Sequence, residues 1–344
     1  MRKHTLVAGL VAGAILIAAC GSDDDDPVAS DAAGTSSPPG AAVTTAPASS
    51  AAPATSVAAG STGAPAAPST AAETSASSET TEAAEGPQAI VSLAPTHTET
   101  LFAIGAGDQV IAVDDQSDFP AEAVEKVTDL SGFEPNVEAI AGYEPDLVVM
   151  SDATIQPQLE GLGIAVWVGP APTTFDEAFT QIEQLGAATG HVGEAAELVG
   201  QLSVDIDAAV ASVPAPAVPL SIYHELDNTF FSANSATFIG QAYAAFGLQN
   251  IADQAEGDSA GYPQLNAEAI IGADPDLIFL ADGSFGESPE TVAARPGWQD
   301  IAAVANGNVF VVDEDVASRW GPRIAEYVQF VADSLAQVAV GADG

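Results

Sequence analysis

One segment occurs twice in this chain, and the repeat constrains the fold more than any other feature. The copies are residues 136–150 (NVEAIAGYEPDLVVM) and residues 266–280 (NAEAIIGADPDLIFL). Aligned without a gap, they share Asn, Glu, Ala, Ile, Gly and Pro-Asp-Leu at the same offsets. Each copy predicts a short helix capped by its Asn, a stop at the Pro, and a strand that is apolar on both faces. Two copies predict two similar α/β lobes.

The remaining folded sequence alternates between strand and helix patterns, which is typical of parallel α/β lobes. We expect capping boxes at residues 96–99 and 174–177. Helical periodicity runs from 175 to about 213 with a possible break at Gly190, and it predicts the connector between the lobes. The predicted fold class is therefore α/β, with two parallel-sheet lobes joined by a single long connector helix and a ligand cleft between them. The expected boundaries are 88–190 for the first lobe, 191–216 for the connector and 217–344 for the second lobe.

The N-terminal region predicts export and attachment rather than a core. Arg2, Lys3 and His4 precede a short apolar run that ends at Ala18-Ala19-Cys20-Gly21. This pattern resembles a bacterial lipobox, so residues 1–20 are expected to be a lipoprotein signal peptide and Cys20 the lipidated residue. The alternative is an ordinary secretory signal. Residues 21–87 are dominated by Ala, Gly, Ser, Thr and Pro, which predicts a disordered linker.

Composition excludes several classes of function. The 344 residues include 48 acidic and six basic side chains, for a formal charge of −42. Nucleic-acid binding is excluded, because affinity for phosphate backbones comes from clustered Lys and Arg. Cys20 is the single cysteine, so no intrachain disulfide or cysteine metal cluster can form. No nucleophile elbow, phosphate loop or dinucleotide fingerprint is present, and we expect no catalytic activity and no cofactor of its own.

Several further segments carry a family resemblance. They are residues 91–120, TFIGQ at 237–241, residues 295–313 and SRWGPRI at 318–324, in addition to the repeat. Together they resemble the substrate-binding lipoproteins of ABC importers for iron chelates, haem and cobalamin. The resemblance implies a monomer on the outer face of the cytoplasmic membrane, anchored through Cys20. It also implies a metal chelate bound between the lobes and delivery to a permease dimer with its ATPase.

The resemblance and the loop positions together predict the site residues. Glu138 and Glu268, one per lobe at equivalent helix starts, are expected to dock onto the two permease subunits; the alternative is a carboxylate that only stabilises its helix. The loop at 130–133 lacks the tryptophan found in similar cobalamin binders, and Phe133 is its expected substitute. The expected ligand contacts are Thr96, His97, Gln116, Phe119, Phe133, Tyr223, Glu225, Tyr262, Trp298, Arg319 and Trp320.

Some alternatives remain open from sequence. Arg319 is expected either to pair with oxygen atoms of the chelate or to form an ion pair with a nearby acid, and Arg323 to be structural. His97 and His224 could converge on a free transition-metal ion, but no His-x-His or His-Glu-x-x-His spacing is present, so no metal site is predicted. A surface interaction protein without a small ligand is the other alternative.

Overall fold

The computed structural model describes residues 86–214, 216, 218–255 and 260–342. The predicted signal peptide, Cys20 and residues 21–85 of the expected linker lie outside this part of the chain. None of the helices in the described part is both long enough and apolar enough to cross a membrane.

The first lobe is built on four parallel strands in the order β2-β1-β3-β4. Strand β1 (Ile90–Ser92) pairs with β2 (Val110–Val113) and with β3 (Leu147–Met150), which pairs with β4 (Ala165–Val168). Both β1 and β3 are buried along their length, as expected for apolar strands covered on two faces. The helices between them are α1 (Pro95–Ala103), α2 (Ala121–Val124), α3 (Val137–Ala141) and α4 (Gln156–Gly161), with a 3-10 turn at Gly107–Gln109.

The second lobe repeats this order with β6-β5-β7-β8, again all parallel. Its strands are β5 (Ser221–Glu225), β6 (Gln249–Asn250), β7 (Leu277–Leu280) and β8 (Val309–Val311). Its helices include α7 (Phe238–Ala244), α8 (Ala267–Ala273), α9 (Pro289–Ala293), α10 (Ala302–Ala305) and α11 (Glu314–Ser318). This lobe also contains 3-10 turns at Ile251–Gln254, Gly283–Phe285 and Trp298–Asp300. The predicted α/β class and the parallel sheets are confirmed.

The sequence repeat corresponds to the same local structure in both lobes. Asn136 and Asn266 cap α3 and α8 by accepting from the amides of Ala139 and Ala269, at 3.0 and 2.9 Å. The Asp of each Pro-Asp-Leu motif then ties the incoming strand to the preceding one. Asp146 Oδ2 accepts from the amide of Ala89 at 3.1 Å, and Asp276 Oδ2 accepts from the amide of Ser221 at 2.8 Å. The shared residues therefore fix the helix start and the strand register.

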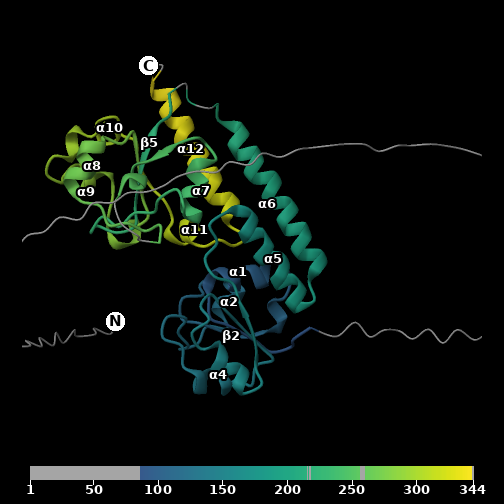
Figure 1. The fold of residues 1–344 in the computed structure, drawn as a ribbon. Coiled ribbons are helices and arrows are strands. Elements are labelled where there is room, and N and C mark those ends of the chain that lie inside the picture. The colour runs from purple at the N-terminus through teal and green to yellow at the C-terminus, as the bar shows by residue number, and fades with distance from the viewer. Residues whose placement is uncertain (1–85, 215, 217, 256–259, 343–344) are drawn as a thin grey trace, which may run out of the picture. The chain divides into compact units, whose positions relative to one another are not determined.

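Three long helices accompany the two sheets (Figure 1). Helix α5 (Phe175–Thr189) ends at Gly190, whose φ of 87° is the left-handed conformation that favours glycine, and α6 (Val192–Ser212) follows. Helix α6 packs against both α5 and α12 (Ile324–Ala342). Helices α5 and α6 contribute to both cores, with Ile182 and Leu202 in the first and Ala178 and Ile206 in the second. The connection between the sheets is therefore a pair of packed helices.

The two predicted capping boxes have different outcomes. Thr174 caps α5 by accepting from the amide of Glu177 at 3.2 Å, but Glu177 bonds to Thr173 rather than back to Thr174. The box at 96–99 is wrong. Helix α1 begins two residues earlier than this box requires, because its N-cap is Ala94 rather than Thr96; Ala94 makes no side-chain cap, and Pro95 is the first helical residue. Because Pro95 starts the helix, Glu99 lies within it and not at its cap, and its buried side chain forms ion pairs with Arg319 and Arg323.

Candidate ligand-binding site

A cavity of about 440 Å³ lies at the carboxyl ends of the first three strands of the first lobe. Ligand pockets in open parallel sheets form at this end of the strands. The residues that follow β1, β2 and β3 line one side, and the loop at 132–135 lines the other. Phe133, whose side chain is 86% exposed, stands at the mouth. The lining residues are Leu93, Ala94, Pro95, Asp114, Gly132, Phe133, Pro135, Met150, Ser151, Asp152 and Thr154.

Two aspartates give this cavity its electrostatic character. Asp114 is buried, and its Oδ1 has no hydrogen-bond partner. Burial raises the pKa of Asp114 to about 6, since the charged form is poorly solvated there. Asp152 is exposed and accepts from the amide of Thr154 at 2.7 Å, and hydrogen bonds from Thr154 lower its pKa. The lining is therefore apolar and acidic.

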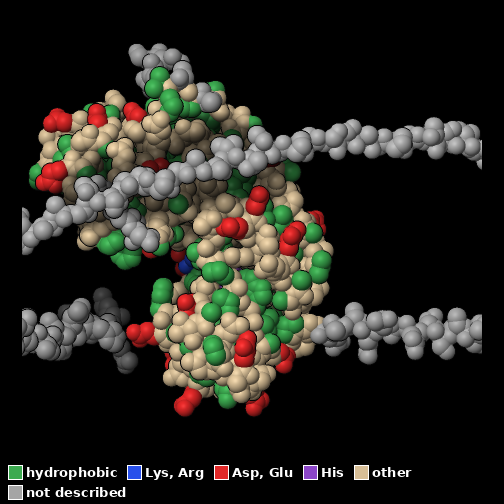
Figure 2. Space-filling model, in the orientation of Figure 1, with side chains coloured by type: hydrophobic (Ala, Val, Ile, Leu, Met, Phe, Trp, Pro, Cys, Tyr) green, Lys and Arg blue, Asp and Glu red, His purple; other side chains and the backbone are tan. Residues whose placement is uncertain are grey.

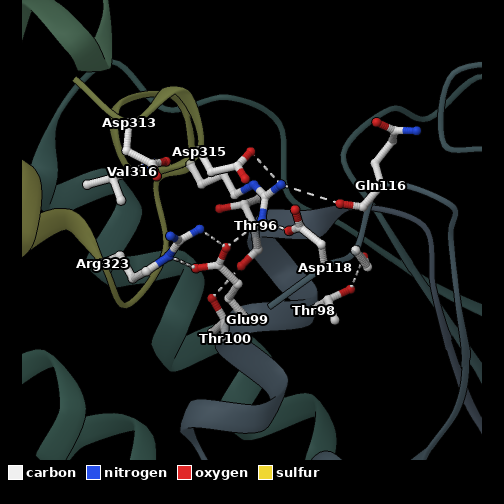
Figure 3. Close-up of polar contacts among 12 residues, drawn as sticks. Thr96, Thr98, Glu99, Thr100, Gln116, Asp118, Asp313, Asp315, Val316 and Arg323 are labelled. Atoms are coloured by element: carbon white, nitrogen blue, oxygen red, sulfur yellow. Dashed lines mark hydrogen bonds and ion pairs between the residues drawn. The ribbon is translucent and has the colours of Figure 1, made fainter. Parts of the chain in front are cut away.

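A network of ion pairs connects the two lobes (Figure 3). Arg319 follows α11 in the second lobe, and its Nη1 lies 2.8 Å from Glu99 and 2.7 Å from Asp118 in the first lobe. Its Nη2 pairs with Asp315 at 2.5 Å and donates to the carbonyl of Gln116. Figure 3 shows the side chain of Gln116 directed away from these contacts.

Arg323 completes the network. It donates to both oxygens of Glu99, from Nε at 2.8 Å and from Nη2 at 2.6 Å. Its guanidinium also lies 4.6 Å from the centre of the Phe119 ring, which is 43% exposed. The side chain of Glu99 has no exposed surface, and its buried negative charge is balanced by the guanidinium groups of Arg319 and Arg323. Of the two roles expected for Arg319, the structure contains the ion pair, and Arg323 has the structural role expected of it.

The second lobe contains another buried charge cluster, at the end of β5. Arg295 forms a two-pronged ion pair with Glu225, at 2.6 and 2.5 Å, and contacts Glu287 at 2.8 Å. Its guanidinium also stacks 4.6 Å from the Trp298 ring. Asp282 lies close to this cluster, is 2% exposed, and has two carboxylate oxygens without a partner. Burial, with the negative charge of Glu225, raises the pKa of Asp282 to about 7.

Three of the predicted contact residues are buried in the second lobe. Tyr223 and Trp298 are 0% and 1% exposed and belong to the same apolar cluster. Glu225 is also fully buried, and Arg295 occupies both of its oxygens. We correct these three assignments. The loop-like sequence suggested accessibility, but alternation along β5 places Tyr223 on the face that packs against Trp298.

Other predicted contacts lie where the lobes meet or on the surface. His97 is buried in the first lobe, and its Nε2 lies 2.7 Å from the carbonyl of Gly169. Its ring meets Trp320 of the second lobe edge to face, at 6.0 Å between centroids. Trp320 donates to Gln181 at 3.1 Å. Thr96 is buried beside them with an unpartnered Oγ1, and Tyr262 is 38% exposed.

The two histidines considered for a metal ion are each bound within their own lobe. His224 is fully buried, and its Nδ1 lies 2.7 Å from the hydroxyl of Tyr243. Burial lowers the pKa of His97 to about 4 and that of His224 to about 3, so both rings are neutral at pH 7. In the described part of the chain, no group of three or more His, Cys, Asp or Glu is arranged to hold a metal ion.

The sequence analysis did not identify several residues that lie in the cavity, in the buried charge clusters or on an exposed loop. The repeat continues two residues past its strands, to Asp152 and Asp282, and this identity was an available signal. Phe285, in the loop after β7, is 80% exposed and has no such signal. Glu99 was assigned to a cap, and only the fold reveals its two arginine partners. Asp114 simply follows a strand.

The expected docking residues occupy equivalent positions in the two lobes. Glu138 and Glu268 are exposed, each on the second residue of its helix, α3 and α8. On the face drawn in Figure 2, acidic side chains are spread over the surface, and basic atoms show in the notch at the middle of the view.

The fold and the cavity define a two-lobed α/β binding protein. A family model described as periplasmic binding protein matches residues 90–316. The chain belongs to this family of solute-binding proteins. A Bacillus subtilis protein described as an uncharacterized ABC transporter substrate-binding lipoprotein, YvrC, is 31% identical over 259 residues, 72% of this chain and 80% of the relative.

Two further relatives carry names that specify a ligand. A cobalamin-binding protein of Halobacterium salinarum is 31% identical over 260 residues, 72% of this chain and 69% of the relative. The crystal structure of the vitamin B12 binding protein BtuF of Vibrio cholerae superposes with a TM-score of 0.61 at 25% identity. That match covers 74% of this chain and 98% of BtuF.

Proposed function

We propose that this protein is the extracytoplasmic solute-binding component of an ABC importer and that it binds a metal chelate. The observation that carries the proposal is the cavity at the carboxyl ends of the first-lobe strands, in a chain of the periplasmic binding protein family. Its volume of about 440 Å³ lies within the range of small-molecule sites. The names of the relatives that bind cobalamin support a chelate as cargo.

The proposed contacts are residues that the structure leaves available at or near the strand ends. Phe133 supplies apolar surface in the cavity, and Phe119 and Tyr262 supply exposed rings. A flat conjugated ligand would stack on such faces. Gln116, His97, Thr96, Arg319 and Trp320 are proposed to border the ligand rather than to hold it, because they are buried, mutually bonded or turned away.

Attachment and delivery are part of the proposal. The lipobox pattern at Cys20 supports a lipid anchor on the outer face of the cytoplasmic membrane, and YvrC is described as a lipoprotein. The partners would be a permease dimer and its ATPase, with the protein acting as a monomer that catalyses no reaction itself.

A thermal-shift screen of the full-length protein in mild detergent tests the binding function. The probes are cyanocobalamin, haem, ferric siderophores and bare divalent ions. A ligand at 100 times its Kd adds about 2.7 kcal/mol to the free energy of unfolding. We expect one chelate to raise the melting temperature. Stabilisation by bare ions alone would contradict the proposal, as would no response to any probe.

The docking proposal rests on Glu138 and Glu268. Two exposed carboxylates at equivalent helix starts suit two similar permease subunits. The double variant Glu138→Arg/Glu268→Arg is expected to abolish uptake of the cargo in cells while ligand affinity stays unchanged. Glu160→Arg, on the exposed surface of α4, is the control. Normal uptake by the double variant would refute docking through these residues.

A further inference from the structure

Each positively charged side chain of the described residues forms a hydrogen bond or an ion pair with another group of the protein. These side chains are Lys126, Arg295, Arg319 and Arg323. Lys126 Nζ donates to the carbonyl of Val110 at 2.7 Å. The three arginines pair with carboxylates at 2.5–2.8 Å. An anionic ligand would therefore have to compete with built-in carboxylates for each guanidinium.

Arg319 illustrates the point, since it lies where the two lobes meet. The carboxylates of Glu99, Asp118 and Asp315 contact it. The carboxylate of Glu99 also binds Arg323. Two positive charges thus face three negative charges. The cluster does not offer an unmatched positive charge to a ligand. In the second lobe, Arg295 likewise faces Glu225 and Glu287.

The cavity itself adds negative charge. Asp114 lines it with one buried oxygen that lacks a hydrogen-bond donor, and Asp152 lines it with an exposed carboxylate. Asp114 also lies two residues before Gln116, whose carbonyl accepts from Arg319. A buried acceptor without a donor is costly to the folded state.

We infer, on the basis of the proposed function, that this cavity selects chelates that present hydrogen-bond donors or positive charge toward it. Primary amides, hydroxyls and ammonium groups are examples of such groups. The cavity discriminates against chelates that present carboxylate or catecholate oxygens. The reason is electrostatic: like charges at close range repel, and among the described residues each arginine is already paired with carboxylates. Within the proposed cargo class, this favours amide-bearing corrins and neutral or cationic hydroxamates over haem and tricatecholates.

Two pairs of matched probes test the inference on the full-length protein. The first pair is dicyanocobinamide, whose corrin carries amide side chains, and dicyanocobyrinic acid, in which carboxylates replace the amides. The second pair is ferrioxamine B, with its free terminal ammonium, and its N-succinyl derivative, with a carboxylate in that place. Titration calorimetry at pH 7.5 and 0.15 M salt gives the ratio of Kd values within each pair.

For the pair that binds, we expect the amide or ammonium member to bind at least tenfold more tightly than its carboxylate twin. Asp152→Asn and Asp114→Asn are each expected to reduce this ratio several-fold, mainly by improving affinity for the carboxylate twin. Asp207→Asn, on the exposed surface of α6, should leave the ratio unchanged. Because Asp152 is exposed, its replacement tests the inference even if Asp114→Asn folds poorly.

The outcomes separate this inference from the proposed function. Equal or tighter binding of a carboxylate twin overturns the inference and leaves the binding function standing. Unchanged ratios in both Asp variants overturn the assignment of selectivity to the cavity. Binding of none of the four probes also overturns the inference, while the thermal-shift screen with haem and the other siderophores decides the proposed function separately.

Discussion

Asp152 and Asp282 occupy the same position of the repeat but have opposite environments. Asp152 is exposed, and hydrogen bonds with Thr154 lower its pKa. Asp282 is 2% exposed beside Glu225, and burial raises its pKa to about 7. The sequence identity predicts equivalent backbone positions, but a pKa depends on which side chains pack nearby. For this reason the sequence could locate these residues and could not assign their charge.

Replacing Asp282 with Asn should stabilise the protein at high pH. The folded-state pKa of about 7 exceeds the unfolded value of about 4, so the stabilising contribution of the protonated form is complete below pH 4 and is lost as pH rises through 7. Asn cannot ionise beside Glu225 and Glu287, and Arg295 keeps both of these partners. Asp282→Asn should therefore raise the free energy of unfolding by about 2–4 kcal/mol at pH 8, with a much smaller gain near pH 4.5.

Urea denaturation at both pH values measures this effect. Asp152→Asn, at the equivalent repeat position, is the matched control and should give no stabilisation at pH 8. A gain for Asp282→Asn that is the same at pH 4.5 and pH 8 would mean that ionisation of Asp282 is not its cause.

Glu99→Gln should destabilise the protein more than any other single change in the interlobe network. Glu99 is fully buried and neutralises part of the charge of both Arg319 and Arg323. Loss of one partner of a buried ion pair costs about 3–5 kcal/mol, because charge is left unpaired. Asp118→Asn, whose side chain is 62% exposed, should cost at most about 1 kcal/mol. Equal effects of the two variants in urea denaturation would contradict this account.

At the level of elements, the repeat was the most reliable predictor. Its Asn caps, Pro stops and apolar strands form α3, β3, α8 and β7 because each step depends on local contacts. The predicted box at 96–99 failed because Pro95 starts α1 two residues before the predicted first helical residue, His97. Tyr223 and Trp298 were misplaced for a different reason, since burial is decided by packing against segments distant in sequence.

The Pro-Asp-Leu aspartates make a prediction at the same scale. Asp276 Oδ2 accepts from both the amide and the hydroxyl of Ser221, at 2.8 and 2.9 Å, and so joins α8–β7 to the start of β5. Asp276→Ala removes the acceptor and should cost about 1–3 kcal/mol of unfolding free energy. Asp207→Ala, on exposed α6, should change it by less than about 0.5 kcal/mol. Indistinguishable urea midpoints would show that this contact is not stabilising.

At the level of the whole molecule, both sheets direct their carboxyl-end loops to a common junction. The loop after β2 supplies Asp118, and the segment after β8 supplies Arg319. The ion pair of these two residues and the buried pairs of Glu99 in α1 with Arg319 and Arg323 hold the lobes together. The composition indicated that the arginines have acidic partners, because the folded sequence contains few basic residues and many acidic ones. The pairing itself could not be read from sequence, since 220 residues separate Glu99 from Arg319.

The most direct test of the account is a chelate titration that compares the full-length protein with its Phe133→Ala variant. Phe133 is 86% exposed at the mouth of the cavity, so its removal should leave the fold intact. We expect the wild type to bind cyanocobalamin or a ferric hydroxamate with a Kd in the micromolar range or below, and Phe133→Ala to bind at least tenfold more weakly. Leu162→Ala, 60% exposed beyond α4, should bind like the wild type. Absence of binding, or an affinity unchanged by Phe133→Ala, would contradict the account.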